Sequence, residues 1–296
     1  MALSKKKEQQ YLAKVKVDGM YLKRIKTNQT EAMCLEAVKQ DGNTLEYVIN
    51  QTEEICLEAI KQNGKALQYV NKQTPEICLK AVKQYGKALL YVENQTEEIC
   101  LEAVKQDGEA LEYVRKQTYD VCLEAVRQDG AALEFVENQT TEICLEAVRQ
   151  YGHALAYIQN PTPELYLEAV KQNGWALQYV EEQTYEICLE AVKRNGEALA
   201  YVREQTSELC LEAVKQNGLA LRYVERQTEE ICFAAIRENV HSASQIRSKT
   251  EEMDYLKTIL EKNKSKSYRM IRSQLANKDI NLKDSPYHVL EQLYGY

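Results

Sequence analysis

Nine cysteines carry the most versatile chemistry of this 296-residue chain, because thiolates bind metals and attack electrophiles. No two of them are closer than 22 residues, whereas metal sites need clustered Cys or His ligands. Equivalent residues of stacked helices lie about 8–10 Å apart, beyond disulfide reach. We therefore predict buried free thiols, no metal site and no cofactor. The nine are Cys34, Cys56, Cys78, Cys100, Cys122, Cys144, Cys188, Cys210 and Cys232.

A second ladder consists of aromatic residues at the same 22-residue spacing. One ring per repeat could stack nucleic-acid bases, as in some RNA-binding solenoids. The acidic surroundings and the lack of a varying polar residue beside each ring favour packing between repeats instead. The ladder comprises Tyr47, Tyr69, Tyr91, Tyr113, Phe135, Tyr157, Tyr179, Tyr201 and Tyr223.

Both ladders belong to a repeat of 22 residues, exemplified by TEEICLEAVKQDGEALEYVRKQ from Thr96 to Gln117. Only four prolines and eleven glycines occur, and Glu, Ala, Leu, Lys and Gln are good helix formers. These features predict an all-α protein. Positions are counted from the threonine, and repeats 1 to 10 begin at Thr30, Thr52, Thr74, Thr96, Thr118, Thr140, Thr162, Thr184, Thr206 and Thr228.

The repeat contains start and stop signals for a helix. The threonine is placed to cap a helix start, and the glycine at position 13 to end that helix in the left-handed conformation. A second, shorter helix is expected at about positions 14–21. The glutamine at position 22 faces inward, which predicts an amide ladder that satisfies loop backbone groups. In repeat 4 the expected inward-facing residues are Ile99, Cys100, Leu101, Ala103, Val104, Ala110, Leu111, Tyr113 and Val114.

Helix pairs this short must be stabilised by their neighbours. The sequence therefore predicts an α-solenoid of tandem 22-residue helix-turn-helix repeats with helical caps at both ends. Residues 1–29 form a basic N-terminal segment and a degenerate cap repeat, residues 30–249 the ten-repeat solenoid, and residues 250–296 a helical C-terminal cap.

Charge is distributed unevenly, although the whole chain carries −7. Residues 1–29 carry +6, residues 30–240 carry −16 and residues 241–296 carry +3. An acidic array repels phosphate backbones, which makes nucleic acid an unfavourable partner and a basic protein a favourable one. Glu102, Glu124 and Glu146 represent the expected acidic face. No signal peptide or membrane-spanning run is recognisable, so we expect a cytoplasmic protein without membrane association.

The core EICLEAVKQDGEALEYV resembles the family called "domain of unknown function 4116", whose repeats occur in tandem in giant-virus and some bacterial proteins. Ala103, Val104, Gly108, Leu111 and Val114 are the matching residues, and the same positions match over about residues 30–239. The resemblance implies a helical array and no particular activity.

Partner specificity is expected where stacking leaves the residue type free. Position 14 varies without any packing rule, and exposed aromatic residues make binding hot spots. Irregularities gather in repeats 6 and 7. The predicted partner-binding residues are Tyr119, Tyr151, His153, Trp175, Tyr185 and Leu219.

No catalytic signature has supporting context in this sequence. We therefore expect a non-enzymatic scaffold that binds a basic protein partner, as an inhibitor or effector in host–parasite or phage-defence conflict. The alternative is a nucleic-acid-binding solenoid that uses the tyrosine ladder and the basic tails.

Overall fold

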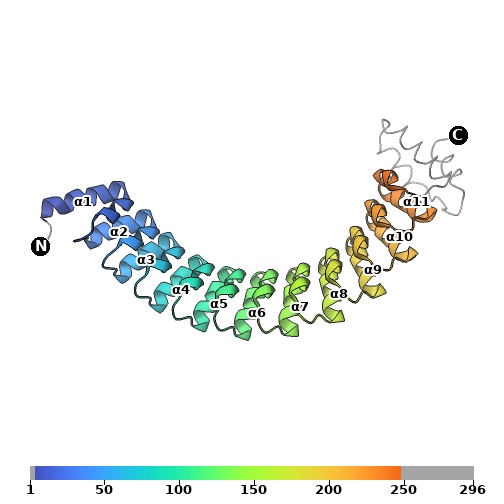
Figure 1. Cartoon of the computed structure of the whole chain (residues 1–296), viewed down its shortest axis with the longest axis horizontal. Helices are drawn as coiled ribbons and strands as arrows, with labels where there is room; N and C mark the ends of the chain where they lie inside the picture. The colour runs from blue at the N-terminus through green and yellow to red at the C-terminus, as the bar shows by residue number, and fades with distance from the viewer. Residues whose placement is uncertain (1–3, 248–296) are drawn as a thin grey trace, which may run out of the picture. The chain divides into compact units, whose positions relative to one another are not determined.

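The computed structural model describes residues 4–247, and within them it is helical and free of strands (Figure 1). One α-helix and one 3-10 helix alternate in each repeat, which confirms the all-α repeat architecture. No helix of the described range is long and apolar enough to cross a membrane. The predicted C-terminal cap, residues 250–296, lies outside the described residues.

The helices have nearly constant lengths. The α-helices are α1 (Lys5–Val17), α2 (Glu31–Gln40), α3 (Glu53–Gln62), α4 (Pro75–Gln84), α5 (Glu97–Gln106), α6 (Tyr119–Gln128), α7 (Thr141–Gln150), α8 (Pro163–Gln172), α9 (Tyr185–Arg194), α10 (Ser207–Gln216) and α11 (Glu229–Glu238). The 3-10 helices are η1 (Gly19–Arg24), η2 (Gly42–Tyr47), η3 (Gly64–Tyr69), η4 (Gly86–Tyr91), η5 (Gly108–Tyr113), η6 (Gly130–Phe135), η7 (Gly152–Tyr157), η8 (Gly174–Tyr179), η9 (Gly196–Tyr201), η10 (Gly218–Tyr223) and η11 (Val240–Gln245).

Contacts divide the described chain into two compact parts. The first part holds residues 4–150 and 157–159, and the second holds residues 151–156 and 160–247. In the first part, α2 to α7 lie side by side in one layer and η1 to η6 form a second layer (Figure 1). In the second part, α8 to α11 and η8 to η11 are arranged in the same way. Within each part, an α-helix packs against its own 3-10 helix and against the preceding one.

The helices α2 to α11 each begin directly after their threonine, as predicted, whereas α1 follows Ser4. The hydroxyl oxygen of Thr52 accepts a hydrogen bond from the backbone N–H of Ile55 at 3.4 Å, and Thr96 accepts one from Ile99 at 3.3 Å. These bonds satisfy one of the N–H groups that have no partner inside the helix.

The helix does not end on a left-handed glycine, so the predicted role of position 13 is wrong. In repeat 4, the α-helix stops at Gln106 and Asp107 is extended, with φ −153° and ψ 110°. Gly108 then begins the 3-10 helix without a positive φ. The requirement for glycine must therefore come from its surroundings.

Those surroundings are the backbone of the next repeat. A Cβ added to Gly108 would lie 2.7 Å from the carbonyl oxygen of Ala125, and a Cβ on Gly196 would lie 2.3 Å from that of Ala213. Both carbonyls belong to the last turn of an α-helix, where they accept the N–H of the C-cap residue, and they cannot move aside as a flexible side chain can. Glycine at position 13 thus allows a 3-10 helix to touch the following α-helix.

The predicted second, shorter helix is present, but it is a six-residue 3-10 helix at positions 13–18 and not at about positions 14–21. The carboxylate of Asp107 accepts from the N–H of Glu109 at 3.1 Å, and Asn63 accepts from Lys65 at 3.1 Å. Such local bonds favour a tight turn over an α-helix. Runs of 3-10 helix this long are uncommon, so we attribute their stability to the stack.

The core lies between the two layers. Most residues predicted to face inward in repeat 4 are buried, but Leu101 and Tyr113 are only half-buried. The buried ones are Ile99, Cys100, Ala103, Val104, Ala110, Leu111 and Val114.

An atypical first repeat precedes the array. The helix α1 has 13 residues, of which only Val15 is buried. The N–H of Gly19 donates to the Oε1 of Gln40 at 2.9 Å, so this repeat is joined to the next by a side-chain amide. Its polar outer side is what a terminal repeat requires.

Replacing Gly196 by Ala is expected to destabilise the protein by about 1–3 kcal/mol, the usual cost of overpacking. The added Cβ would lie 2.3 Å from the Ala213 carbonyl oxygen, and the two elements would have to separate. Denaturant unfolding followed by far-UV circular dichroism measures the change. Gly19→Ala is the matched control, because its Cβ would lie 3.1 Å from the Ala37 carbonyl oxygen, and a smaller loss is expected there. Identical unfolding midpoints for Gly196→Ala and the native chain would contradict this role of glycine.

Candidate functional site

The glutamine at position 22 forms the predicted amide ladder. Nε2 of Gln51 donates to the carbonyl of Tyr69 at 2.7 Å, and its Oε1 accepts from the N–H of Asn71 at 2.8 Å. Gln95 and Gln183 make the same two bonds to the following repeat. This prediction is confirmed, and position 22 is therefore committed to stacking.

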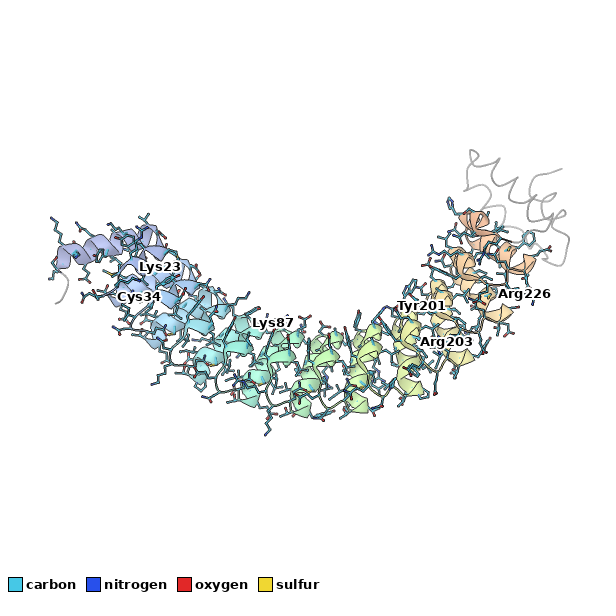
Figure 2. All side chains as sticks on the ribbon, in the orientation of Figure 1. Lys23, Cys34, Lys87, Tyr201, Arg203 and Arg226 are labelled. Carbon is cyan, nitrogen blue, oxygen red and sulfur yellow. The ribbon has the colours of Figure 1, made fainter. Side chains whose placement is uncertain are left out.

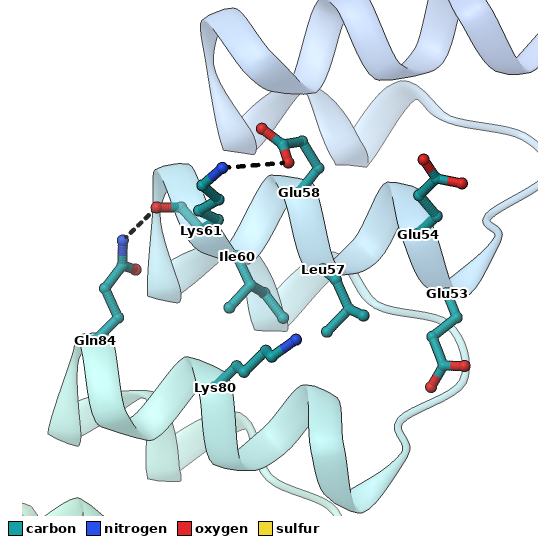
Figure 3. A pocket seen from close by; sticks show the side chains of 8 residues that line it. All are labelled: Glu53, Glu54, Leu57, Glu58, Ile60, Lys61, Lys80 and Gln84. Carbon is teal, nitrogen blue, oxygen red and sulfur yellow. Dashed lines mark hydrogen bonds and ion pairs between the residues drawn. The ribbon is translucent and has the colours of Figure 1, made fainter.

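A second amide ladder lies at position 11, to which sequence reasoning assigned no role. Oε1 of Gln128 accepts from the N–H of Gly108 at 2.7 Å. Nε2 of Gln84 donates to the carbonyl of Lys61 at 2.8 Å (Figure 3). The signal was available, because glutamine occupies position 11 in eight of the ten repeats.

The cysteines are buried free thiols, as predicted. Sγ of Cys122 lies 3.3 Å from Oε1 of Gln117, and Sγ of Cys78 lies 3.5 Å from that of Gln73. Burial raises the pKa of the Cys122 thiol to about 11, so it is a protonated hydrogen-bond donor at neutral pH. Among residues 4–247, no group of three or more His, Cys, Asp and Glu could hold a metal ion.

The junction between repeats 6 and 7 shows that this glutamine and this cysteine act together. The residue at position 22 is Pro161 and the residue at position 5 is Tyr166, so both members of the pair are replaced at once. Tyr166 is 4% exposed. A larger side chain thus fills the place of the thiol where no glutamine is present.

The predicted acidic face is a surface of mixed charge. The carboxylate of Glu102 lies 3.3 Å from Lys105 and 3.4 Å from Lys83, and that of Glu146 lies 3.9 Å from Arg127. Although desolvation opposes the shift, Lys105 and Lys83 hold the pKa of Glu102 below its usual range. Glu124, at the same repeat position, is half-buried. Basic residues at position 10 therefore offset much of the charge at position 7.

Acidic residues also lie at the starts of the α-helices, where Glu76 pairs with Lys80 at 2.9 Å. In Figure 3, Glu53 and Glu54 lie in the first turn of α3, away from Lys61 near its end. Positions 2 and 3 of the ten repeats hold thirteen acids and no base. All are exposed except the half-buried Glu229. We call this set the acidic edge of the two parts. It comprises Glu31, Glu53, Glu54, Glu76, Glu97, Glu98, Asp120 and Glu142 in the first part, and Glu164, Glu186, Glu208, Glu229 and Glu230 in the second.

Two predicted partner-binding residues, Tyr119 and Tyr185, lie at position 2 within this edge and are 43% and 47% exposed. The hydroxyl of Tyr185 donates to Glu208 at 2.9 Å. A hydrogen bond with Glu142 raises the pKa of Tyr119. Both tyrosines therefore belong to the α-helical layer, apart from the other predicted residues.

Three of those other residues lie on the 3-10 layer of the second part. The ring of Tyr151 stacks on His153 with centroids 5.4 Å apart, and His153 meets the ring of Tyr179 edge-on at 5.7 Å. Trp175 meets Tyr201 edge-on at 5.7 Å. We call these five residues the aromatic row. In both edge-on contacts, the ring at position 14 meets the tyrosine at position 18 of the next repeat. The sequence did not predict this pairing.

Trp175 and Leu219 occupy position 14 of their repeats and are both half-buried. Asn173 accepts from the N–H of Trp175 at 3.0 Å, and Asn217 from that of Leu219 at 3.0 Å. Leu219 stands two repeats after Trp175 and joins no ring contact, so the structure leaves it outside the aromatic row.

Stacked 22-residue units of this kind, with a ladder of amide hydrogen bonds at each end of the 3-10 helices, define an α-solenoid whose exposed positions form its binding surfaces. The chain belongs to the family described as "Domain of unknown function (DUF4116)", which matches residues 31–73, 52–96, 74–117, 96–140, 118–160 and 162–205. Each match spans two consecutive repeats, and the resemblance seen in the sequence is confirmed. The comparisons with curated proteins and with solved structures returned no match.

The thiols predict a loss of stability in alkaline solution. Burial raises the pKa of Cys34, Cys56, Cys122 and Cys210 from 9.0 to about 11 in the folded chain. Above pH 9 the unfolded chain loses these protons first. The free energy of unfolding should therefore be fully retained below pH 9 and should fall as the pH rises towards 11.

Urea unfolding across this pH range measures the slope. The triple variant Cys56→Ala, Cys122→Ala, Cys210→Ala is the control for tyrosine ionisation, which both proteins share. Its unfolding free energy should fall less steeply with pH, and an unchanged slope would contradict the assignment.

Proposed function

We propose that this protein is a non-catalytic scaffold that binds a basic protein partner along its acidic edge. The observation that carries the proposal is the placement of charge. The acidic edge holds −13, and the ten repeats from residue 30 to residue 249 hold −14 in total. Almost all the net negative charge of the repeats is therefore carried by residues at helix starts, of which Glu76 pairs with Lys80.

The spacing of these carboxylates suits a basic segment. Neighbouring helices lie about 8–10 Å apart, and each presents one or two acids at this edge. An extended chain rises about 3.3 Å per residue. Basic residues at every third position would therefore be spaced like the neighbouring helices, and each could meet the carboxylates of one repeat. Each exposed ion pair contributes about 0–1 kcal/mol, and useful affinity therefore requires several pairs.

The remaining chemistry of the described residues supports a binding role. The thiols are buried and protonated, and the position-7 carboxylates Glu102 and Glu146 are paired with bases. Within this proposal the protein acts in the cytoplasm as an inhibitor or effector in host–parasite or phage-defence conflict. That element rests on the giant-virus and bacterial occurrence of the family's repeats.

A nucleic-acid-binding array is the second proposal, and the N-terminal cap favours it. Nζ of Lys14 lies 5.1 Å and the guanidinium of Arg24 lies 5.6 Å from the centroid of the Tyr21 ring. A basic surface that includes aromatic rings suits single strands. The acidic edge opposes this proposal, because a phosphate backbone would be repelled along most of the repeats.

The triple variant Glu54→Lys, Glu98→Lys, Asp120→Lys should weaken binding of a basic partner about tenfold, because three exposed pairs of roughly 0.5 kcal/mol each are lost. Partners recovered by affinity capture and identified by mass spectrometry, and a fluorescent peptide of repeated Lys-Gly-Gly triplets, serve as ligands. Fluorescence anisotropy at several salt concentrations gives the affinities, which should fall as salt rises.

The matched control is Glu102→Lys, Glu124→Lys, Glu146→Lys, which changes the net charge by the same amount. A smaller loss is expected, because Glu102 and Glu146 already pair with basic residues of the chain. Equal losses in both variants, or binding that does not depend on salt, would contradict the proposal. A shift of single-stranded RNA at physiological salt, with no basic protein captured, would replace it with the second proposal.

A further inference from the structure

The 3-10 layer of the second part carries an aromatic surface that has few formal charges, with Glu197 at its end beside Tyr201. Residues 151–156 and 173–180 contain no charged side chain. At position 17, where repeats 4 and 9 have Glu112 and Arg222, this surface has the exposed residues Ala156 and Gln178. The aromatic row lies among these small and neutral residues, so it is not suited to the basic partner of the acidic edge.

The hydrogen bonds within this surface determine which of its polar groups remain available to a ligand. Oδ1 of Asn173 accepts from the N–H of Trp175 at 3.0 Å, so its Nδ2 group faces Nδ1 of His153 at 3.1 Å and donates to it. A neutral imidazole in that contact carries its proton on Nε2. Within residues 4–247, the indole N–H of Trp175 and the hydroxyls of Tyr179 and Tyr201 have no hydrogen-bond partner. The surface thus combines ring faces with several N–H and O–H donors.

We propose that the aromatic row binds a proline-rich segment in the polyproline II conformation. Such a segment makes no internal hydrogen bonds, its prolines have no N–H, and its carbonyls need external donors. It can be entirely uncharged, which matches residues 151–156 and 173–180, where no side chain is charged. Aromatic side chains that line a groove are a general way to bind it, because the rings pack against the flat proline rings.

The repeat spacing matches this ligand. Polyproline II has three residues per turn and rises about 3.1 Å per residue, so every third side chain recurs after about 9.3 Å. Packed helices are separated by about 8–10 Å. Prolines three residues apart therefore fall on rings of successive repeats, such as Tyr179 and Tyr201. A β-strand, whose side chains recur on one face after about 6.6 Å, would lose this register.

In other repeats, charged side chains occupy the positions that correspond to the aromatic row. In repeats 3 and 4, Lys87 and Glu109 form an ion pair at position 14. Beyond Tyr201, Arg222 lies 2.6 Å from Glu197 and 4.7 Å from the centroid of the Tyr223 ring. Figure 2 shows Lys87 and Tyr201 each on the 3-10 side of its own part. These ion pairs place charged side chains on the 3-10 helices of repeats 3, 4, 8 and 9, and Glu197 marks the end of the uncharged surface beside Tyr201.

This inference is independent of the acidic edge, which lies on the α-helical layer, and the two can fail separately. Trp175 is the only tryptophan in the chain, so its fluorescence reports on the row alone. The probe is a blocked peptide of three Pro-Pro-Ala triplets, with a Gly-Gly-Ala peptide of equal length as the comparison. We expect a saturable change with the proline peptide only, with the same dissociation constant at low and high salt.

Fluorescence anisotropy of the labelled peptide then tests the individual rings. Trp175→Ala and Tyr201→Ala should each raise the dissociation constant at least tenfold. Tyr91→Ala is the matched control at the same repeat position as Tyr201, and less than a twofold change is expected. Unchanged far-UV circular dichroism shows that each variant is folded. The triple variant at Glu54, Glu98 and Asp120 should bind the proline peptide as the native chain does.

Several results would overturn the proposal. They are the absence of saturable binding at millimolar peptide, equal binding of the Gly-Gly-Ala peptide, and equal losses for Tyr91→Ala and Tyr201→Ala. Binding of oligouridylate or of an oligosaccharide by the row, without binding of the proline peptide, would assign the surface to another ligand class.

Discussion

The contact on which the stack depends joins the glycine of one repeat to an α-helical carbonyl of the next. A Cβ on Gly108 would lie 2.7 Å from the Ala125 carbonyl oxygen, so only glycine allows this approach. Because the two elements are this close, the Gly108 N–H can donate a hydrogen bond to Oε1 of Gln128 at 2.7 Å. The amide at position 22 ties the other end of the 3-10 helix to the preceding repeat. Together these contacts hold a six-residue 3-10 helix that would have little stability alone.

Stacking also decides which residues remain for recognition. Positions 5, 11, 13 and 22 are committed to the thiol, amide and glycine contacts, and position 7 is largely paired with position 10. Positions 2 and 3 are different, because their carboxylates stabilise the helix start through the macrodipole while remaining exposed. A requirement of local helix stability, repeated along the chain, therefore produces an acidic edge. The aromatic row arises where position 14 carries a ring.

Much of this could be predicted from the sequence. The period, the threonine caps, the buried thiols and the amide ladder at position 22 follow from local rules applied to a repeated pattern. The role of glycine could not, because glycine serves a left-handed turn and a close approach equally well, and only the neighbouring helix distinguishes them. The sequence predicted a second, shorter helix but not its 3-10 type, because a six-residue pattern fits both helical periods. Its signal was the Asp or Asn at position 12, as in Asp107.

The candidate surfaces were less predictable. Glu102 and Glu146 were expected on an acidic face, but Lys83 and Arg127 reach them from the preceding repeat, and sequence spacing does not reveal that register. Tyr151, His153 and Trp175 were found as exceptions to the repeat, whereas their pairing with Tyr179 and Tyr201 required the fold.

Hydrogen exchange of the glycine amides, in protein labelled with 15N at glycine, reports on the contact between each glycine and the next repeat. Gly152 and Gly196, which donate to Gln172 and Gln216 at 2.8 and 2.6 Å, should exchange slowly. Gly174 should exchange faster, because Arg194 replaces glutamine at position 11 of the next repeat and has no acceptor. Equally fast exchange at all three glycines would contradict the stacking contact.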